Sequence, residues 1–265
     1  MTKKGFSWGL PASNTTQAVL SHLYETVRGN FDVRHQLPKR VHEEVFFVLH
    51  TRPWQRTSVM AELLTAHYGR IVVMVRGAKR PMSVYRGILQ PFMPLLLNWQ
   101  GRQEMKTLTS AQWLGTMVPP WSRDLMSAFY MNELILRLTQ REDPQEGLFR
   151  LYVRTLARFA DQEGSRAALL RSFEKELLRI LGWGIQAVDQ APYYAIYEGA
   201  LVGIPSPAND RPSWMYARVA ALQRDDFSRP YARAHRALLG ALLHAHLDGK
   251  ILKTRQVMQD LQSFE

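Results

Sequence analysis

The sequence predicts an α+β protein in which a small five-stranded β-barrel precedes an all-helical domain. Across residues 43–113, apolar and polar side chains alternate or form short β-branched runs, as they do in strands. After the pair Pro119-Pro120, apolar residues recur at helical spacing instead. Because proline interrupts both helices and sheets, this pair marks a boundary. We therefore predict a barrel domain at residues 41–116 and a helical domain at residues 117–265.

Residues 1–40 form a separate N-terminal extension in this prediction. Met1 to Asn14 are polar without any period, and only one weak helix is expected, between Thr15 and Arg28. The extension carries six Lys and Arg against two acidic residues. We expect it to be poorly ordered. It is either a basic arm that touches nucleic acid or a solvated extension.

Five short strands make up the predicted barrel. We expect them at residues 45–50, 58–66, 71–76, 88–99 and 104–113. The triplet Arg52-Pro53-Trp54 ends the first of them. No predicted helix among them is long enough for a crossover between parallel strands, so a closed barrel fits better than an open sheet. The oligonucleotide-binding (OB) fold is the natural five-stranded candidate.

The helical domain begins with three apolar stripes. They occupy residues 125–138, 148–159 and 170–181. A Gly-Trp-Gly triplet ends the third stripe. Residues 185–212 contain four prolines and are predicted to be irregular. Two further helices are expected at residues 231–247 and 254–264.

Composition narrows the classes of function. The chain has 34 Lys and Arg against 23 Asp and Glu, a net charge of +11, which favours a polyanion as partner and nucleic acid first. The absence of cysteine excludes a disulfide framework, a cysteine nucleophile and a cysteine-based zinc site. No stretch reaches the ~18 to 20 apolar residues that a membrane span needs. No apolar run of a secretory signal follows Lys3 and Lys4. We expect a cytoplasmic protein without a membrane partner.

The predicted barrel carries much of the positive charge. Residues 41–113 hold nine Lys and Arg against four Glu. Aromatic residues are interleaved with them, namely Trp54, Tyr68, Tyr85, Phe92 and Trp99. Cations neutralise phosphates and rings stack on bases, which is what a groove for a single strand needs. The predicted DNA-binding residues are Arg52, Arg56, Arg70, Arg76, Lys79, Arg80, Arg86, Arg102 and Lys106. The alternative is that the aromatic residues form the core and the cations are only solvated.

None of the candidate catalytic patterns is complete. Glu104-x-Lys106 offers half of a nuclease metal site but lacks a further carboxylate for Mg²⁺. Gly249-Lys250 lacks the earlier glycine and the Ser or Thr of a phosphate-binding loop. The sequence has no Gly-x-Ser-x-Gly elbow. We therefore predict a protein that is not an enzyme and that uses no cofactor and no metal.

A row of cations lies beside the third apolar stripe. Arg171, Lys175 and Arg179 recur every four residues, next to Phe173 and Leu177. Such a row suits an acidic peptide that ends in an apolar side chain. An ordinary solvated helix face would show the same pattern.

Motifs from both halves of the chain resemble the RecO family of DNA repair proteins. Their order and spacing match over roughly residues 43–257. The barrel half contributes Val48-Leu49-His50-Thr51-Arg52-Pro53-Trp54, Gly69-Arg70, Gly77-Ala78, Gly87-Ile88-Leu89-Gln90-Pro91-Phe92, Pro94-Leu95-Leu96-Leu97 and Glu104-x-Lys106-Thr107-Leu108. The helical half contributes Tyr130-x-Asn132-Glu133-Leu134, Leu181-Gly182-Trp183-Gly184 and Gly249-Lys250-x-Leu252-Lys253-Thr254-Arg255.

The resemblance implies an N-terminal OB domain, a C-terminal helical domain and a recombination mediator that is not an enzyme. Such proteins bind single- and double-stranded DNA and anneal complementary strands at the nucleoid. They associate with RecR and help to load RecA onto strands covered by single-stranded-DNA-binding protein (SSB). Their helical domain recognises the acidic C-terminal tail of SSB, which ends in Phe. The resemblance makes Arg171 a tail contact, and the predicted tail-binding residues are Arg171, Phe173, Lys175, Leu178 and Arg179.

Two features depart from the family pattern. The first is that about the first 40 residues lie outside it, and the second concerns a zinc site. Many members carry a cysteine-based zinc site after the Leu-Gly-Trp-Gly or Leu-Gly-Tyr-Gly segment. Because this chain has no cysteine, we predict no zinc, and residues 185–212 must be ordered in another way. The alternative function is a passive OB-fold protein that binds single-stranded RNA or DNA. The motifs argue against that alternative, whereas charge and fold do not.

Overall fold

The computed structural model describes residues 23, 38–114, 124–145, 147–160, 165–185 and 191–262, with side chains as far as residue 257. The predicted disorder of residues 1–40 lies outside these ranges, apart from Leu23 and residues 38–40. The chain divides into two compact units. The barrel unit comprises Met1–Ala128 and Gln140–Gln162, and the second unit comprises Phe129–Thr139 and Glu163–Glu265.

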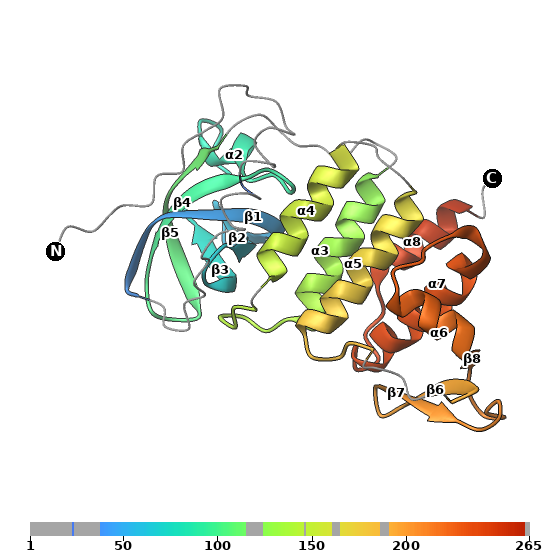
Figure 1. Ribbon diagram of the computed structural model, residues 1–265. Coiled ribbons are helices and arrows are strands. Elements are labelled where there is room, and N and C mark those ends of the chain that lie inside the picture. Colours follow the sequence, from blue (N-terminus) through green and yellow to red (C-terminus); the bar gives the residue numbers. More distant parts are fainter. Residues whose placement is uncertain are drawn as a thin grey trace. The chain divides into compact units, whose positions relative to one another are not determined.

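Five strands close into a barrel (Figure 1). They are β1 (Arg40–Trp54), β2 (Ser58–Thr65), β3 (Gly69–Val75), β4 (Leu95–Gln100) and β5 (Met105–Trp113). Their order is β1-β2-β3-β5-β4, and β1 pairs with β4 to close the barrel. Only the contact between β3 and β5 is parallel among these five strands. This is the strand order of an OB fold, so the predicted fold class is confirmed.

The first strand pairs with two neighbours because it bends. Residues 40–46 pair with β4, and residues 46–54 pair with β2. The register shifts between Val41 and Glu44 and again between Val48 and His50. Bulges of this kind bend a strand and increase its twist, which closure of a small barrel requires.

The first strand includes the triplet Arg52-Pro53-Trp54 and ends with it at Trp54. Pro53 lies opposite Val59 of β2. Along this part of β1 the only described neighbouring strand is β2. Within the described residues the other edge of β1 is unpaired there, so a proline without an amide hydrogen is tolerated.

The fourth strand is shorter than predicted, because β4 begins at Leu95 rather than at residue 88. The chain first forms the short helix α2 (Tyr85–Ile88). Pro91 and Pro94 follow, and Phe92 between them has φ +69°. Proline has no amide to donate and a left-handed residue does not fit a strand ladder, so this segment cannot be a regular strand.

Apolar side chains from all five strands fill the barrel. The buried cluster includes Phe46, Leu63, Val73, Leu97 and Leu108. The rings of Tyr68 and Trp99 meet edge to face in the same cluster, with their centroids 5.2 Å apart. Two of the five aromatic residues of the predicted DNA surface are therefore core residues.

The helix α4 (Leu148–Ala160) belongs to the barrel unit, although we predicted it within the helical domain. Residues 45–49 of β1 are all buried. Because neighbouring side chains of a strand point to opposite faces, both faces are covered here: one by the interior of the barrel and the other by another element. On that second face the ring of Phe47 meets the rings of Phe149 and Tyr152, at centroid distances of 5.7 and 5.1 Å. The helix thus covers the outer face of β1.

The helix α3 (Leu125–Leu138) spans the division between the units, and its residues from Phe129 on belong to the second. The other helices of the second unit are α5 (Arg166–Ile180), α6 (Tyr216–Gln223), α7 (Arg229–Ala245) and α8 (Lys253–Gln262). Helices α7 and α8 correspond to the last two predicted helices. The sequence analysis missed α6, which is only eight residues long.

The prediction that residues 185–212 are irregular is wrong for the part that the structure describes. The strands β6 (Tyr193–Tyr197), β7 (Ala200–Ile204) and β8 (Ser213–Met215) form an antiparallel sheet in the order β7-β6-β8. Glu198 and Gly199 both have positive φ, which suits a tight hairpin turn between β6 and β7. The prolines lie just outside the strands, so they bound the sheet rather than disrupt it.

Aromatic contacts support this small sheet. The guanidinium of Arg211 lies 4.1 Å from the centre of the Tyr197 ring. His246, just after α7, stacks on Trp183 with 4.0 Å between ring centroids, and its Nε2 lies 3.2 Å from the carbonyl oxygen of Gly199. Within the described residues, no group of His, Cys, Asp or Glu is placed to hold a metal ion. None of the helices described here is long and apolar enough to cross a membrane.

Candidate nucleic-acid interface

A basic surface lies at one end of the barrel, where two connections meet. Arg52 lies near the end of β1 and Arg56 lies in the turn between β1 and β2, whereas Arg76, Lys79 and Arg80 follow β3. All five side chains are exposed. Since β1 ends and β2 begins where β3 ends, the topology brings both groups to the same end of the barrel. We call these five residues the basic end.

Hydrogen bonds hold the two connections of the basic end together. The backbone amide of Lys79 donates to the carbonyl of Thr57 at 2.9 Å. Its ammonium lies 3.5 Å from the carbonyl oxygen of Gln55. The amide of Arg80 donates to the carbonyl of Gly77 at 3.0 Å, which closes a tight turn in the loop. The cations therefore stand on a braced loop rather than on a free one.

Two further predicted DNA-binding residues are exposed but lie elsewhere on the barrel unit. Arg86 is on α2, in the connection that leaves the basic end. Arg102 is in the turn between β4 and β5, which is at the opposite end of the barrel. The structure therefore groups five of the nine predicted residues, keeps Arg86 nearby in the same connection and separates Arg102 from them.

Arg70 and Lys106 do not fit the predicted role, because both are buried and paired with acids. Arg70 donates to Glu62 at 2.8 Å, and burial lowers the pKa of its guanidinium despite that carboxylate. The ammonium of Lys106 binds Glu142, and burial lowers its pKa as well. Their charge is neutralised inside the protein, so neither can bind a phosphate without breaking an internal ion pair.

A loop distant in the sequence, which contains Arg141 and Glu142, completes the ion pairs around these buried cations. Arg141 pairs with both Glu62 and Glu104, and the amide of Glu142 donates to the carbonyl of Arg70 at 2.8 Å. The loop approaches β3 so closely that a Cβ at Gly69 would lie 2.8 Å from the carbonyl oxygen of Asp143. Gly69 is therefore required there, both for this approach and for its φ of +67°.

The aromatic residues of the barrel are mostly structural. Tyr68, Phe92 and Trp99 are buried, whereas Trp54 and Tyr85 are half-buried. The sequence analysis missed Trp113, which is 49 % exposed at the end of β5. Because β5 runs parallel to β3, Trp113 is at the same end of the barrel as the basic end.

In the second unit, two of the predicted tail-binding residues are core residues. Phe173 and Leu178 of α5 are both 1 % exposed, so the prediction that they line a peptide site is wrong. Both continue the apolar stripe of the helix, which packs inward. A residue on such a stripe is a ligand contact only where a cavity opens beside it, and the cleft found in this unit is lined by other residues.

The three cations of α5 all have acidic partners. Arg171 donates to Glu174 at 2.6 Å, Lys175 donates to Asp225 at 2.8 Å and Arg179 donates to Glu176 at 2.6 Å. Their charge is partly offset within the unit. The row predicted from the sequence exists, but its cations are already engaged.

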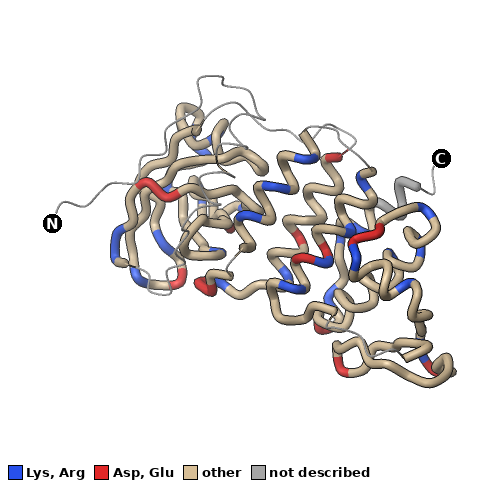
Figure 2. The backbone as a smooth tube through the Cα atoms, in the orientation of Figure 1, with Lys and Arg blue, Asp and Glu red and all other residues tan. Residues whose placement is uncertain are grey.

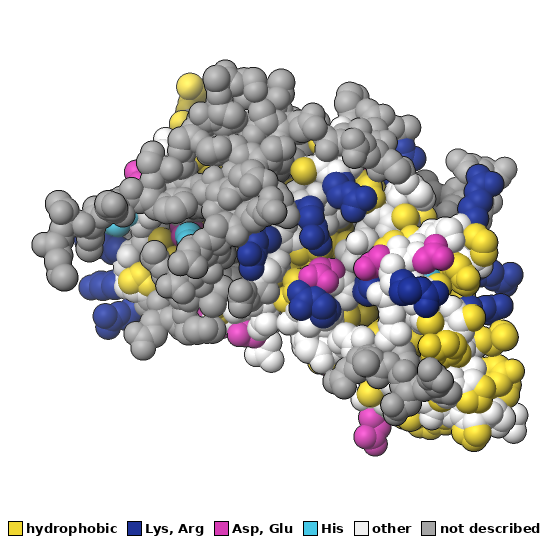
Figure 3. Space-filling model, in the orientation of Figure 1, with side chains coloured by type: hydrophobic (Ala, Val, Ile, Leu, Met, Phe, Trp, Pro, Cys, Tyr) yellow, Lys and Arg dark blue, Asp and Glu magenta, His cyan; other side chains and the backbone are white. Residues whose placement is uncertain are grey.

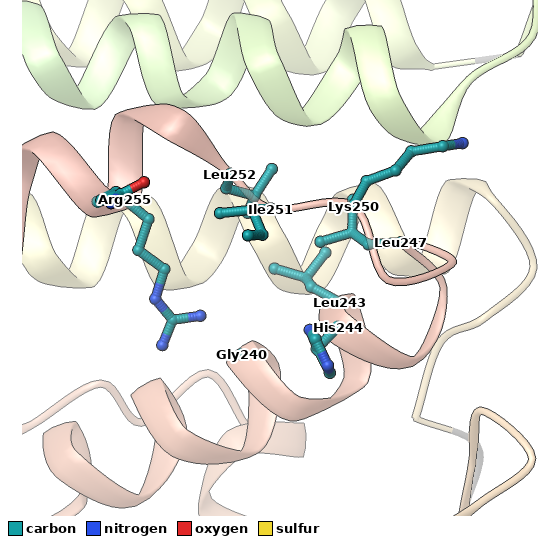
Figure 4. A pocket seen from close by; sticks show the side chains of 9 residues that line it. Gly240, Leu243, His244, Leu247, Lys250, Ile251, Leu252 and Arg255 are labelled. Carbon is teal, nitrogen blue, oxygen red and sulfur yellow. The ribbon is translucent and has the colours of Figure 1, made fainter.

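A cleft of about 360 Å³ opens between α7 and α8 (Figure 4). Its apolar lining is Leu243, Leu247, Ile251 and Leu252. Lys250 and Arg255 lie to either side of Ile251 and Leu252 in Figure 4. Ile251 is 72 % exposed, so its apolar side chain is open to solvent beside the cleft. This cleft was not predicted from the sequence.

The buried carboxylate of Glu174 on α5 is influenced by Arg255, which lines the cleft. Glu174 is completely buried, and this burial raises its pKa. The positive charges of Arg171 and Arg255, together with a 2.6 Å hydrogen bond from Tyr130, act in the opposite direction. Arg171 and Arg255 therefore act on one common acid, although they come from different helices.

Two family descriptions match nearly the whole described chain. "Recombination protein O N terminal" matches residues 40–117, and "Recombination protein O C terminal" matches residues 123–253. The chain belongs to the RecO family. The gap between the two matches contains Pro119-Pro120, the pair that predicted the boundary. Family membership places the chain in DNA repair and recombination.

Individual RecO relatives extend the match across most of their length. The DNA repair protein RecO of Ralstonia nicotianae is 42 % identical over 234 residues, 84 % of this chain and 86 % of that protein. That of Burkholderia orbicola is 40 % identical over 237 residues, 84 % of each. That of Aromatoleum aromaticum is 37 % identical over 235 residues, 84 % of this chain and 98 % of that protein. The resemblance found in the motifs is thus confirmed.

Within the RecO frame, the C-terminal match contains most of the cleft between α7 and α8. It ends at residue 253, and Arg255 lies just beyond it. It also contains α4, which packs on the barrel in this chain. The two sequence matches therefore do not coincide with the two compact units.

Proposed function

We propose that the chain is a recombination mediator that binds single- and double-stranded DNA and anneals complementary strands. It would act with RecR on SSB-coated DNA and help to load RecA, at the nucleoid and without enzymatic activity of its own. RecR and RecA enter this proposal through family membership. The observation that carries the DNA-binding part is the braced basic end of the barrel, where five exposed cations from two connections meet.

The basic end binds the phosphate backbone in this proposal. Each Lys or Arg that neutralises a phosphate releases condensed counterions, which gives affinity without sequence preference. Trp113 stands at the same end and offers a ring on which an unpaired base can stack. Cations and an accessible ring together favour a single strand, because duplex bases are not free to stack.

Annealing follows from charge neutralisation. Two complementary strands repel each other through their phosphates, and a protein that covers part of that charge lowers the repulsion. Complementary segments can then meet on one molecule or between two. No step requires a cofactor or the hydrolysis of a nucleotide.

The acidic tail of SSB binds the cleft between α7 and α8 in this proposal. The apolar lining around Leu247 and Ile251 would take the terminal apolar side chain, and Lys250 and Arg255 would bind the acidic residues before it. Arg171 contributes positive potential near Glu174, where Arg255 also acts. This replaces the predicted contacts at Phe173 and Leu178, which are buried.

The DNA-binding part is tested by the salt dependence of binding. Affinity for a fluorescent single strand of about 30 nucleotides is measured between about 50 and 200 mM salt. The triple variant R76Q/K79Q/R80Q should reduce the slope of log affinity against log salt by about 2 units, at ~0.7 per phosphate. The matched control R224Q/R229Q/R233Q removes three exposed arginines of the second unit. An unchanged slope in R76Q/K79Q/R80Q would mean that DNA binds at another surface. If the protein binds single strands but never anneals complementary ones, it is instead the passive OB-fold binding protein of the alternative hypothesis.

A further inference from the structure

A second basic surface lies on α4, outside the residues predicted to bind DNA. The helix has thirteen residues, among them Arg150, Arg154 and Arg158 and no Asp or Glu. Its buried side chains are Leu148, Phe149, Leu151, Tyr152, Val153, Thr155, Leu156 and Phe159. The three arginines recur at every fourth position, so they share the face opposite to the buried one. We call them the arginine stripe.

The packing of α4 holds this face outward. Phe149 and Tyr152 contact Phe47 of β1, which fixes the apolar face on the barrel. Arg154 and Arg158 are exposed, and neither makes an ion pair with any residue that the structure describes. Arg150 is half-buried. Figure 2 shows Lys and Arg positions along α4, and Figure 3 shows basic side chains on the surface of the same face of the molecule.

Three other cations of the barrel unit are paired within the protein. Arg70, Lys106 and Arg141 are each paired with a Glu, so their charge is neutralised within the protein. Among the described residues, Arg154 and Arg158 have no acidic partner, and the same holds for the five residues of the basic end. Like charges four residues apart destabilise a helix slightly, so helix stability does not explain why Arg154 and Arg158 stand together. The stripe therefore indicates an external anion.

The spacing of the stripe suits a nucleic-acid backbone. Four residues of helix rise about 6 Å, so the stripe is about 12 Å long. Phosphates recur every ~3.4 Å along each strand of a duplex, which makes the stripe about three to four nucleotides long. Arginine also binds phosphate through two parallel hydrogen bonds, which lysine cannot do. A regular row of such groups fits a regularly charged polymer better than a peptide with one apolar anchor.

We infer that the arginine stripe is a second phosphate-binding surface, which holds the same DNA strand beyond the basic end. This inference rests on the proposed DNA binding of the barrel. Along β1, Phe47 lies beside α4 and Trp54 adjoins the basic end. Phe47 and Trp54 are seven strand residues apart, which is about 23 Å along β1 at about 3.3 Å per residue. A DNA strand covers this distance with roughly seven nucleotides at duplex spacing. A strand shorter than that reaches one surface, and a longer one reaches both.

The dependence on strand length tests the inference. The variant R154Q/R158Q is compared with wild type on fluorescent oligothymidylates of about 6 and about 30 nucleotides, across the same salt range. With the long strand, the slope should fall by about 1.4 units, at ~0.7 for each lost phosphate contact. With the short strand, it should not change, since the basic end alone binds it. The variant R229Q/R233Q removes two exposed arginines at the same helical spacing on α7 and serves as the matched control.

Each outcome has a distinct meaning. If R154Q/R158Q leaves the long-strand slope unchanged while R76Q/K79Q/R80Q lowers it, the stripe does not bind DNA and the proposed function survives. An equal fall for both strand lengths would contradict the continuation from the basic end. If wild type shows no salt-dependent DNA binding, both the function and the stripe are overturned. Circular dichroism of R154Q/R158Q checks that the helix content is retained, and a conservative R154K/R158K variant should restore most of the slope.

Discussion

Arg171 donates a 2.6 Å hydrogen bond to Glu174, and the carboxylate that accepts it is completely buried. Tyr130 donates to the same oxygen at 2.6 Å. The cation that the sequence assigned to an acidic ligand is therefore held first by an acid of the protein itself. Reversing Arg171 to Glu would place two carboxylates side by side, one of them buried, so it would disturb folding as well as binding.

The burial of Glu174 makes stability depend on pH. Burial raises its pKa above the ordinary value of 4.5, and the charge of Arg171 offsets this only in part. The folded state then holds the proton more tightly than the unfolded state, so this contribution to stability is complete below the unfolded pKa and is lost as pH rises through the raised pKa. E174Q has no such titration. The difference in unfolding free energy, wild type minus E174Q, should fall as the pH rises above about 4.5 in chemical denaturation. A difference that grows with pH would contradict the raised pKa.

Lys106 should contribute nothing to DNA binding, because its ammonium is buried against Glu142. We expect K106M to leave the salt slope of single-strand binding unchanged. The same substitution at the exposed Lys79 should lower the slope by about 0.7 units. Thermal unfolding of both variants separates an effect on folding from an effect on binding. A lower slope in a folded K106M protein would show that the buried pair opens to reach phosphate.

Trp113 should bind bases rather than phosphates. W113A is expected to weaken single-strand affinity by about 1 to 3 kcal/mol, the usual contribution of one stacked base. The salt slope should stay as in wild type, since no charge is lost. W113F, which keeps a ring, should recover much of the affinity. An affinity of W113A equal to that of wild type would mean that the exposed indole is not a stacking platform.

Ile251 should be essential for the acidic tail and irrelevant for DNA. Because it is exposed in the cleft between Lys250 and Arg255, I251D puts a negative charge where the tail must place its apolar end. We expect at least a tenfold loss of affinity for a synthetic SSB tail peptide, about 1.4 kcal/mol. V257D is the matched control, since Val257 is a 43 % exposed residue of α8 outside the cleft. Equal losses in both variants would count against the cleft.

The local pattern of apolar and polar residues predicted the strands of the barrel well. It predicted contacts between residues far apart in the sequence poorly. The strand periods and the turn at Gly69 were sufficient for five strands, and closure followed from the absence of a crossover helix. The ion pairs of Lys106 and Arg141 join residues 36 and 79 positions apart, so charge counting along the barrel could not find them. Likewise, the burial of both faces of residues 45–49 was visible in the sequence, but nothing there identified α4 as the cover.

The second unit shows the same limit. Four prolines suggested an irregular segment, yet they stand at strand ends, where proline is tolerated. Phe173 and Leu178 were assigned to a ligand because they lie beside cations, whereas helical stripes of this kind are usually core. The cleft between α7 and α8 is lined by a connecting loop as well as two helices, so its apolar residues show no single period.

The most direct test of the account is the annealing of two complementary strands that are precoated with SSB. It is measured with fluorophores on the two strands, in parallel with SSB that lacks its acidic tail. The account predicts fast annealing by wild type on intact SSB, a marked loss with tailless SSB or with I251D, and a loss on all substrates with R76Q/K79Q/R80Q. Annealing of naked strands alone, with no dependence on the tail, would contradict the mediator function and leave a basic OB protein that only binds nucleic acid.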